Sequence, residues 1–384
     1  MAKPTPQQSD LAFLRLLATS GIDLMVQMPV LAATIHRLFP SFSLSMIRVD
    51  ENAAPREHYS EHFDEASHQI FASHGDQFAA SDDDPAAFGR LLKNPVPYGT
   101  LIDTSAQYQA GATYQHFFQR NGIHHCLDVA VRSPSGPLGI LGIFRERGTR
   151  GFDSDDVARV AQIYAHLVHA FEAKPLPADF DEVDGGLLVV DGSYRIVWAS
   201  AAACAWLEAA TPGPDRARLM ARGVLPDACQ SLARTFQQSY KPRSSRTAPA
   251  EVPTLTIPVA GGRLRLRAYA LRAELNPETS PRHVGIQLSL EMHRELRVLS
   301  VLDALGLPPQ QRRLAFHLFR RRSPVAIAKD LGVGAETLKS YRREVHARLG
   351  TSGTDELRAE LDRRARSVSL DLRGHLPRPR AALG

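Results

Sequence analysis

The sequence predicts an α+β protein of several domains, in which two α/β segments with antiparallel sheets precede an all-α segment. Apolar residues alternate with polar ones along short runs within the first 292 residues, as is typical of strands. Proline-containing breaks at residues 172–186 and near Pro308–Pro309 divide the chain. The length of 384 residues suggests two to four domains, at roughly 100–200 residues each.

Positive charge is concentrated in the last quarter of the chain. Residues His293–Gly384 contain 19 Lys and Arg against 10 Asp and Glu, whereas the remainder contains 27 against 31. This segregation is typical of a nucleic-acid-binding module joined to neutral or acidic domains. A solvated basic tail is the alternative, but cations also lie inside an amphipathic pattern, which favours the first interpretation.

Several classes of protein are disfavoured by what the sequence lacks. The first residues have no basic region followed by an apolar run, and no stretch has 18 uninterrupted apolar residues, so we expect neither a signal peptide nor a membrane span. The three cysteines (Cys126, Cys204 and Cys229) form no CxxC pair, which favours a reduced, cytoplasmic location without disulfides or structural zinc.

No catalytic or metal-binding motif is found. GxxxxGK[ST], GxSxG and HExxH are all absent, so we do not expect an enzyme. The run His124–Cys126 suggests a metal site, but alternate residues of a strand point to opposite faces and no second ligand pair follows. We therefore expect no metal.

The first segment begins with a helical pattern over Leu11–Phe39, which we expect to break near Pro29. "SFSLSMIRVD" alternates like a strand, and "HHCLDVAVRSPSGPLGILGIFRE" predicts a hairpin with a loop longer than two residues. A helix follows, capped by Asp153 or Ser154, with an apolar stripe that ends at Phe171. This order resembles a GAF domain over residues 8–173.

The second segment follows an expected linker at 174–182. "GGLLVVDGSYRIVWASAAACAWLE" predicts a strand over Gly185–Val190, a turn at Asp191–Gly192, a strand over Tyr194–Ala199 and a helix from Ala201. A second hairpin is expected around Gly261–Gly262, and "RHVGIQLSLEM" reads as a further strand. This order resembles a PAS domain over residues 183–292.

GAF and PAS folds hold haem, flavins, cyclic nucleotides, aromatic compounds or nothing, so the resemblance leaves the cofactor unknown. A small-molecule ligand in these domains is therefore a candidate partner. The aromatic residues Trp198, Trp206, Tyr108 and Tyr114 could line a pocket, although burial in the core is the simpler expectation.

The last segment contains "SPVAIAKDLGVGAETLKSYRREVHARLG". Ser323 and Pro324 form a favoured helix start, and Gly332 is placed for a left-handed turn that ends this first helix. A second helix then reaches Leu349, with apolar residues on one face and cations largely elsewhere. Two short helices joined by a tight glycine turn predict a helix-turn-helix.

The residues "IAKDLGVGAETLKSYRREVHARLG" resemble the LuxR-type DNA-binding domain of bacterial transcription regulators. The resemblance implies a four-helix domain over residues 307–366: a scaffold helix Pro309–Arg320, a positioning helix Pro324–Leu331, a recognition helix Ala335–Leu349 and a last helix from near Thr354. A connecting helix is expected at 293–306 and a disordered tail at 367–384.

This chain departs from the family pattern at four positions. Gln311 and Arg313 stand where the family has acids, so a salt bridge of the scaffold helix is lost or rewired. Gly334 replaces a serine N-cap, and Tyr341 replaces a histidine. These departures make the preferred DNA sequence hard to predict from the family.

The resemblance assigns the DNA contacts to the recognition helix. Thr337 and Lys339 are expected to contact phosphates, and Glu336, Ser340 and Arg343 lie at spacings that could present them to bases. Tyr341 and Arg342 complete the expected DNA-binding set. For any one of these residues, a solvated helix face is the alternative.

The sequence thus predicts a signal-responsive transcriptional regulator that binds double-stranded DNA as a homodimer, with RNA polymerase as a further candidate partner. The alternative is a signalling adaptor whose sensory and C-terminal domains bind a partner protein. The basic face of the recognition helix disfavours this, because the cores of protein interfaces are depleted in charge.

Overall fold

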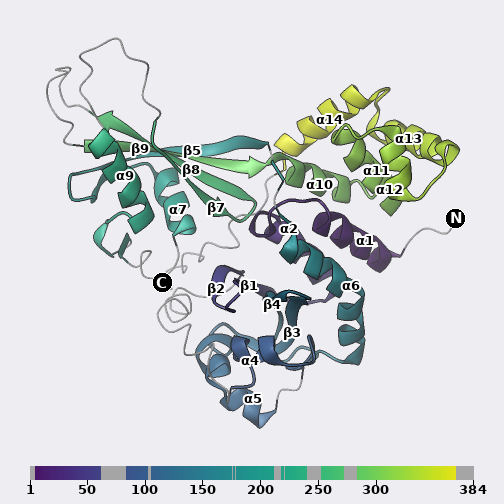
Figure 1. Ribbon diagram of the computed structural model, residues 1–384, viewed down its shortest axis with the longest axis horizontal. Helices are drawn as coiled ribbons and strands as arrows, with labels where there is room; N and C mark the ends of the chain where they lie inside the picture. Colours follow the sequence, from purple (N-terminus) through teal and green to yellow (C-terminus); the bar gives the residue numbers. More distant parts are fainter. Residues whose placement is uncertain are drawn as a thin grey trace, which may run out of the picture. The chain divides into compact units, whose positions relative to one another are not determined.

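The computed structural model describes residues 5–61, 84–102, 105–174, 176–177, 179–211, 218–219, 221–239, 252–271 and 283–368. They form two compact units (Figure 1). Of the described residues, unit 1 contains those up to Asp179 together with those from His293 onward, and unit 2 contains those of Phe180–Met292. A multidomain α+β fold is consistent with this division, while the GAF, PAS and LuxR identities and the domain limits stay predictions.

Unit 1 contains a four-stranded antiparallel sheet with the order β2-β1-β4-β3. Its strands are β1 (Ser43–Val49), β2 (Pro55–Ser60), β3 (Ile123–Ser133) and β4 (Gly136–Glu146). The expected strand pair at β3 and β4 is confirmed, but the expectation of a loop longer than two residues is wrong. Ser133 pairs with Gly136, so the loop has only two residues, and Gly136 adopts a φ of 137° that closes it.

Helices α1 (Pro6–Ala18), α2 (Leu24–Leu38) and α6 (Ser154–Glu172) belong to the same unit, as do the short α4 (Phe88–Lys93), α5 (Ala106–Ala110) and η1 (Tyr114–Phe118). The expected break near Pro29 is wrong, because Pro29 lies inside α2. The chain instead turns between α1 and α2, where Gly21 adopts a φ of 72° and Asp23 caps the next helix.

Unit 2 is a five-stranded antiparallel sheet with the order β6-β5-β9-β8-β7. The strands are β5 (Phe180–Val190), β6 (Ile196–Ala199), β7 (Thr254–Val259), β8 (Gly262–Leu271) and β9 (His283–His293), and α7 (Ala201–Ala210) and α9 (Asp227–Ser239) are the helices of this unit. Alternate residues such as Leu188, Leu266 and Ile286 form its core with Leu207 of α7.

The loop between β5 and β6 also differs from its expected form. Asp191–Gly192 was expected to make a two-residue turn, yet Val190 pairs with Ile196 and leaves five residues between the strands. The Asp191 carboxylate accepts hydrogen bonds from the backbone N–H groups of Ser193 and Arg195, and Tyr194 adopts a φ of 62°. A side-chain-stabilised loop has therefore replaced the expected tight turn.

The C-terminal part of unit 1 is helical: α10 (Arg294–Ala304), α11 (Pro309–Phe319), α12 (Pro324–Leu331), α13 (Ala335–Leu349) and α14 (Thr354–Arg366). The four helices that the resemblance implied lie at α11 to α14. Helix α10 follows β9 without an intervening loop and packs against α11 and α14. The expected disordered tail lies, from residue 369 on, outside the described residues. No described helix is long and apolar enough to cross a bilayer.

A buried ion pair joins the end of β4 to the start of α6. Asp156 is fully buried and Arg145 is 5% exposed, and the Arg145 Nη1 lies 3.1 Å from an Asp156 carboxylate oxygen. Arg150 and Arg159 also pair with Asp156 at 3.2 and 2.9 Å. Removing one partner of a buried pair is costly, because the other charge is left in a medium of low dielectric constant.

We expect Asp156→Asn to lower the free energy of unfolding by about 3 kcal/mol, because Arg145 stays buried without a countercharge. Urea denaturation of the two proteins measures this difference. Asp155→Asn is the matched control: Asp155 is the exposed neighbour on the same helix turn, and its replacement should cost less than about 1 kcal/mol. Equal losses for the two variants would contradict the assigned role of the buried pair.

Candidate nucleic-acid interface

The turn between α12 and α13 is built from local signals. The Ser323 hydroxyl accepts a hydrogen bond from the Ala326 N–H at 3.3 Å and so caps α12. Gly332 ends this helix with a φ of 65°, and the Val333 N–H donates to the Ala328 carbonyl at 3.1 Å. A left-handed glycine followed by this bond is a common helix end, and it fixes the direction in which α13 starts.

One face of α13 is held in the core. Leu338, Val345 and Leu349 are buried, and they share a cluster with Ile327 and Leu331 of α12. The half-buried Tyr341 packs against the same cluster. The side chain of Tyr341 thus belongs to the core side of the helix, although the sequence included it among the expected DNA-binding residues.

The opposite face of α13 is open to solvent. Glu336, Thr337, Lys339 and Arg343 are exposed, while Ser340 and Arg342 are half-buried. Lys339 and Arg343 make no hydrogen bond or ion pair with any residue that the structure describes. Among these residues, the two cations without an ion-pair partner outnumber the one acid, Glu336, and the net positive charge attracts anions. Whether these residues contact DNA stays a prediction.

Gln311 and Arg313, which stand where the resembled family has acids, both contact acids of neighbouring helices. The Gln311 Nε2 donates to a Glu344 carboxylate oxygen of α13, and the other oxygen accepts from the Ser340 hydroxyl at 3.2 Å. Arg313 pairs with Asp330 of α12 at 2.8 Å. This ion pair therefore has its cation on α11 and its acid on α12.

Asp330 also contacts the buried imidazole of His317, whose Nε2 lies 2.6 Å from a carboxylate oxygen. Burial lowers the pKa of His317, and the hydrogen bond with Asp330 opposes that shift. Asp330 and Glu344 were missed by the sequence reasoning. Both are acids in a motif rich in cations, as Glu336 is, so their residue type alone did not single them out.

The other candidate residues of the sequence belong to elements outside the helix-turn-helix. The Tyr114 hydroxyl hydrogen-bonds with His124 Nδ1 at 2.9 Å, and the neighbouring Tyr108 and Cys126 are buried. Trp198 is 55% exposed, so the expectation that it lies in a core is wrong. Among the described residues, no group of three or more His, Cys, Asp or Glu side chains is placed to hold a metal ion.

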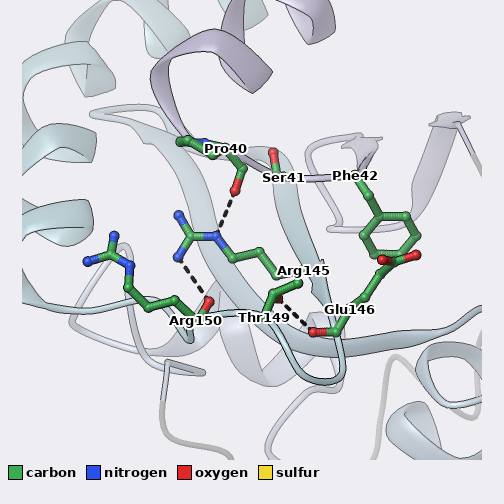
Figure 2. Close-up of a pocket in the computed structure, with 7 residues that line it drawn as sticks. All are labelled: Pro40, Ser41, Phe42, Arg145, Glu146, Thr149 and Arg150. Carbon is green, nitrogen blue, oxygen red and sulfur yellow. Dashed lines mark hydrogen bonds between the residues drawn. The ribbon is translucent and has the colours of Figure 1, made fainter.

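A pocket of about 360 Å³ lies beside the turn between β4 and α6 (Figure 2). It is lined by Pro40, Ser41, Phe42, Arg145, Glu146, Thr149 and Arg150. Figure 2 shows the Arg145 guanidinium donating to the Pro40 carbonyl, a bond of 2.7 Å. Arg145 also donates to the Gly151 carbonyl and to Asp156. Because its guanidinium is hydrogen-bonded to the protein itself, it does not indicate a ligand site.

Comparison with known proteins does not identify a family for this chain. No family model and no curated protein matches the chain. A crystal structure described as a Vibrio cholera VqmA–ligand–DNA complex is 18% identical over 49% of this chain and 85% of that chain, with a TM-score of 0.26. A sensor region of a sensor histidine kinase is 16% identical over 46% and 64%, with a TM-score of 0.17. Both TM-scores are too low for either likeness to carry an argument.

The link between α11 and α13 can be tested at Gln311. We expect Gln311→Ala to lower the free energy of unfolding by about 2 kcal/mol, because hydrogen bonds to charged groups contribute roughly 1.5–3 kcal/mol. Gln310→Ala is the control, since Gln310 is the exposed neighbour on the same helix. Chemical denaturation monitored by helical circular dichroism measures both, and similar small losses would rule out a supporting role for the Gln311–Glu344 contact.

Proposed function

We propose that this chain is a sequence-specific DNA-binding regulator, in which α13 enters the major groove of the duplex. The proposal rests chiefly on the exposed face of α13, where Lys339 and Arg343 have no hydrogen-bond or ion-pair partner among the residues that the structure describes, while the opposite face is buried. Groove binding requires a helix with one face packed in the core of its domain and the opposite, exposed face positively charged, and α13 has both properties.

The exposed residues divide by the part of DNA that each would contact. Thr337 and Lys339 lie in the first turns of α13 and would bind phosphates, which supply affinity without regard to sequence. Glu336, Ser340 and Arg343 would face the base edges, where an arginine paired with guanine discriminates by about 1–3 kcal/mol.

The α/β parts of the two units would receive a signal or a small molecule and pass it to the helices. Two copies would bind two half-sites, and a change in the spacing or orientation of their recognition helices would alter affinity for both. RNA polymerase is the further partner proposed for a regulator of this kind.

A second candidate function is that of a signalling adaptor. Val183, Leu187, Val197 and Trp198 are exposed apolar residues of the adjacent strands β5 and β6, and Val325 of α12 is 81% exposed. Exposed apolar side chains on adjacent strands of one sheet favour binding to another protein. At low salt, an adaptor would bind duplex DNA only as weakly as any weakly basic protein does. The affinity for DNA therefore distinguishes the two functions.

Binding to duplex DNA should fall steeply with salt, with a slope of log affinity against log salt steeper than about −3, because several phosphates are neutralised. We expect Lys339→Ala to weaken binding to every sequence by roughly tenfold and to make the slope shallower by about 1. Fluorescence anisotropy with a labelled duplex measures both quantities. Lys93→Ala, at an exposed lysine of α4, is the control and should change neither.

Arg343→Ala should differ from Lys339→Ala in kind. We expect a loss of about 1–3 kcal/mol on the preferred duplex together with relaxed discrimination at one base pair, because a base contact carries sequence information. Competition between the preferred duplex and its single-base-pair variants measures this. A uniform loss over all variants would assign Arg343 to phosphate binding, and binding that is independent of salt would exclude DNA binding by α13.

A further inference from the structure

The first two helices of the chain pack directly on the helices that carry the helix-turn-helix. Phe13, Leu16 and Leu17 of α1 belong to the same continuous core as the buried residues of α10 to α14. Ile22, Val26 and Val30, from the α1–α2 turn and α2, lie in that core as well. We name the α10–α14 helices the DNA-binding bundle and α1 with α2 the N-terminal helix pair.

Phe13 and Leu17 are 1% and 0% exposed, so their side chains are fully removed from water. Helix α1 contacts α11 of the bundle as well as α2 and α6, so part of this burial is against the bundle. Removal of a buried side chain at this contact is therefore expected to destabilise both sides of it.

A buried cation of the bundle depends on the N-terminal helix pair. Arg312 of α11 is 2% exposed, and one of its Nη atoms donates to the Ser9 hydroxyl of α1 at 2.6 Å. Its other Nη donates to Asp303 of α10 at 2.8 Å, and its guanidinium lies 5.1 Å from the centre of the Phe13 ring. A desolvated guanidinium needs such partners, since an unpaired buried charge is strongly destabilising.

Asp303 also binds the second helix of the pair. Arg37 of α2 donates to an Asp303 carboxylate oxygen at 2.9 Å and to Asp10 of α1 at 2.7 Å. Asp303 thus bridges Arg37 and Arg312, and one polar network joins α1, α2, α10 and α11. At the turn between α1 and α2, the Ser20 carbonyl accepts a further hydrogen bond of 2.6 Å from Arg320, which follows α11.

We propose that the DNA-binding bundle is not an autonomous domain, and that the N-terminal helix pair completes its core and controls its stability. A signal that tightens or loosens α1 and α2 would reach the bundle through this contact, because coupling between two sites is reciprocal. The N-terminal helix pair need not cover the proposed DNA-binding face of α13 to act in this way, since Lys339 and Arg343 stay exposed with the helix pair in place. Only the consequence for DNA binding rests on the proposed function.

Hydrogen exchange of the full chain, without DNA, tests the contact by mass spectrometry. We expect Phe13→Ala to speed amide exchange in α11 and α13 at least tenfold. Phe144→Ala is the matched control: it removes an equally buried phenylalanine of β4, which is absent from the core shared with the bundle. It should speed exchange in β3 and β4 and leave α11 and α13 unchanged. Faster exchange confined to α1 and α2 in Phe13→Ala would overturn the proposal.

A milder pair of variants keeps the test decisive if Phe13→Ala fails to fold. Arg37→Met removes the ion pairs to Asp10 and Asp303, whereas Arg56→Met removes an ion pair of 3.0 Å to Asp50 beside β2. We expect two- to fivefold faster exchange in α10 and α11 for Arg37→Met and no change there for Arg56→Met. Equal exchange in these helices for the two variants would contradict the coupling.

Adding a saturating DNA duplex to the wild-type protein separates this inference from the proposed function. If DNA binds to the bundle, exchange should slow in α1 as well as in α11 and α13, because the stabilisation is shared. Slowing limited to α11 and α13 would overturn the coupling alone. Absence of DNA binding would overturn the proposed function, and the exchange of the variants would still decide whether the bundle depends on α1 and α2.

Discussion

Burial of one stripe of α13 is the constraint on which the candidate DNA-binding surface depends. Leu338, Val345 and Leu349 can enter the core only if the helix is rotated so that Lys339 and Arg343 face water. The left-handed Gly332 fixes where the helix starts, and the Gln311–Glu344 contact holds it against α11. The charged face therefore owes its position to apolar and polar contacts made behind it.

Those contacts do not end within the helix-turn-helix. The core behind α13 continues through α11 and α10 into α1 and α2, at the other end of the sequence. Arg312 shows why this continuity matters, because a buried guanidinium requires oxygen acceptors and Ser9 of α1 is one of them. The helices that display the cations and the helices α1 and α2 are therefore stabilised by the same interactions, and under the proposed function this contact would give a signal a physical route to the candidate DNA-binding surface.

Local sequence signals were sufficient for much of this architecture. Both helices of the turn begin and end where Ser323, Gly332 and Leu349 indicated, since caps and left-handed glycines act over a few residues. Breaks and loops were harder to predict. Pro29 lies within a helix instead of breaking it, and Tyr194 adopts a positive φ that the sequence did not indicate. At Pro29 the burial of the flanking Met28 and Val30 outweighed local propensity, whereas at Tyr194 the loop is held by hydrogen bonds to the Asp191 carboxylate.

Long-range partners could not be predicted from the sequence at all. Ser9 and Arg312 are separated by 303 positions, and nothing in the residues near either one identifies the other. The residues Gln311 and Arg313 drew attention in the sequence, but their contacts with Glu344 and Asp330 on neighbouring helices could not be predicted from it. Pairings of this kind depend on how helices pack, which is decided by the whole core.

Selection of bound duplexes from a random pool by the purified full chain tests the central claim most directly. If α13 reads base edges, repeated rounds should enrich one short motif, and each mismatch within it should weaken binding by about 1–3 kcal/mol. Recovery of duplexes without any common motif, bound no better than the starting pool, would contradict the assignment of this helix to sequence recognition.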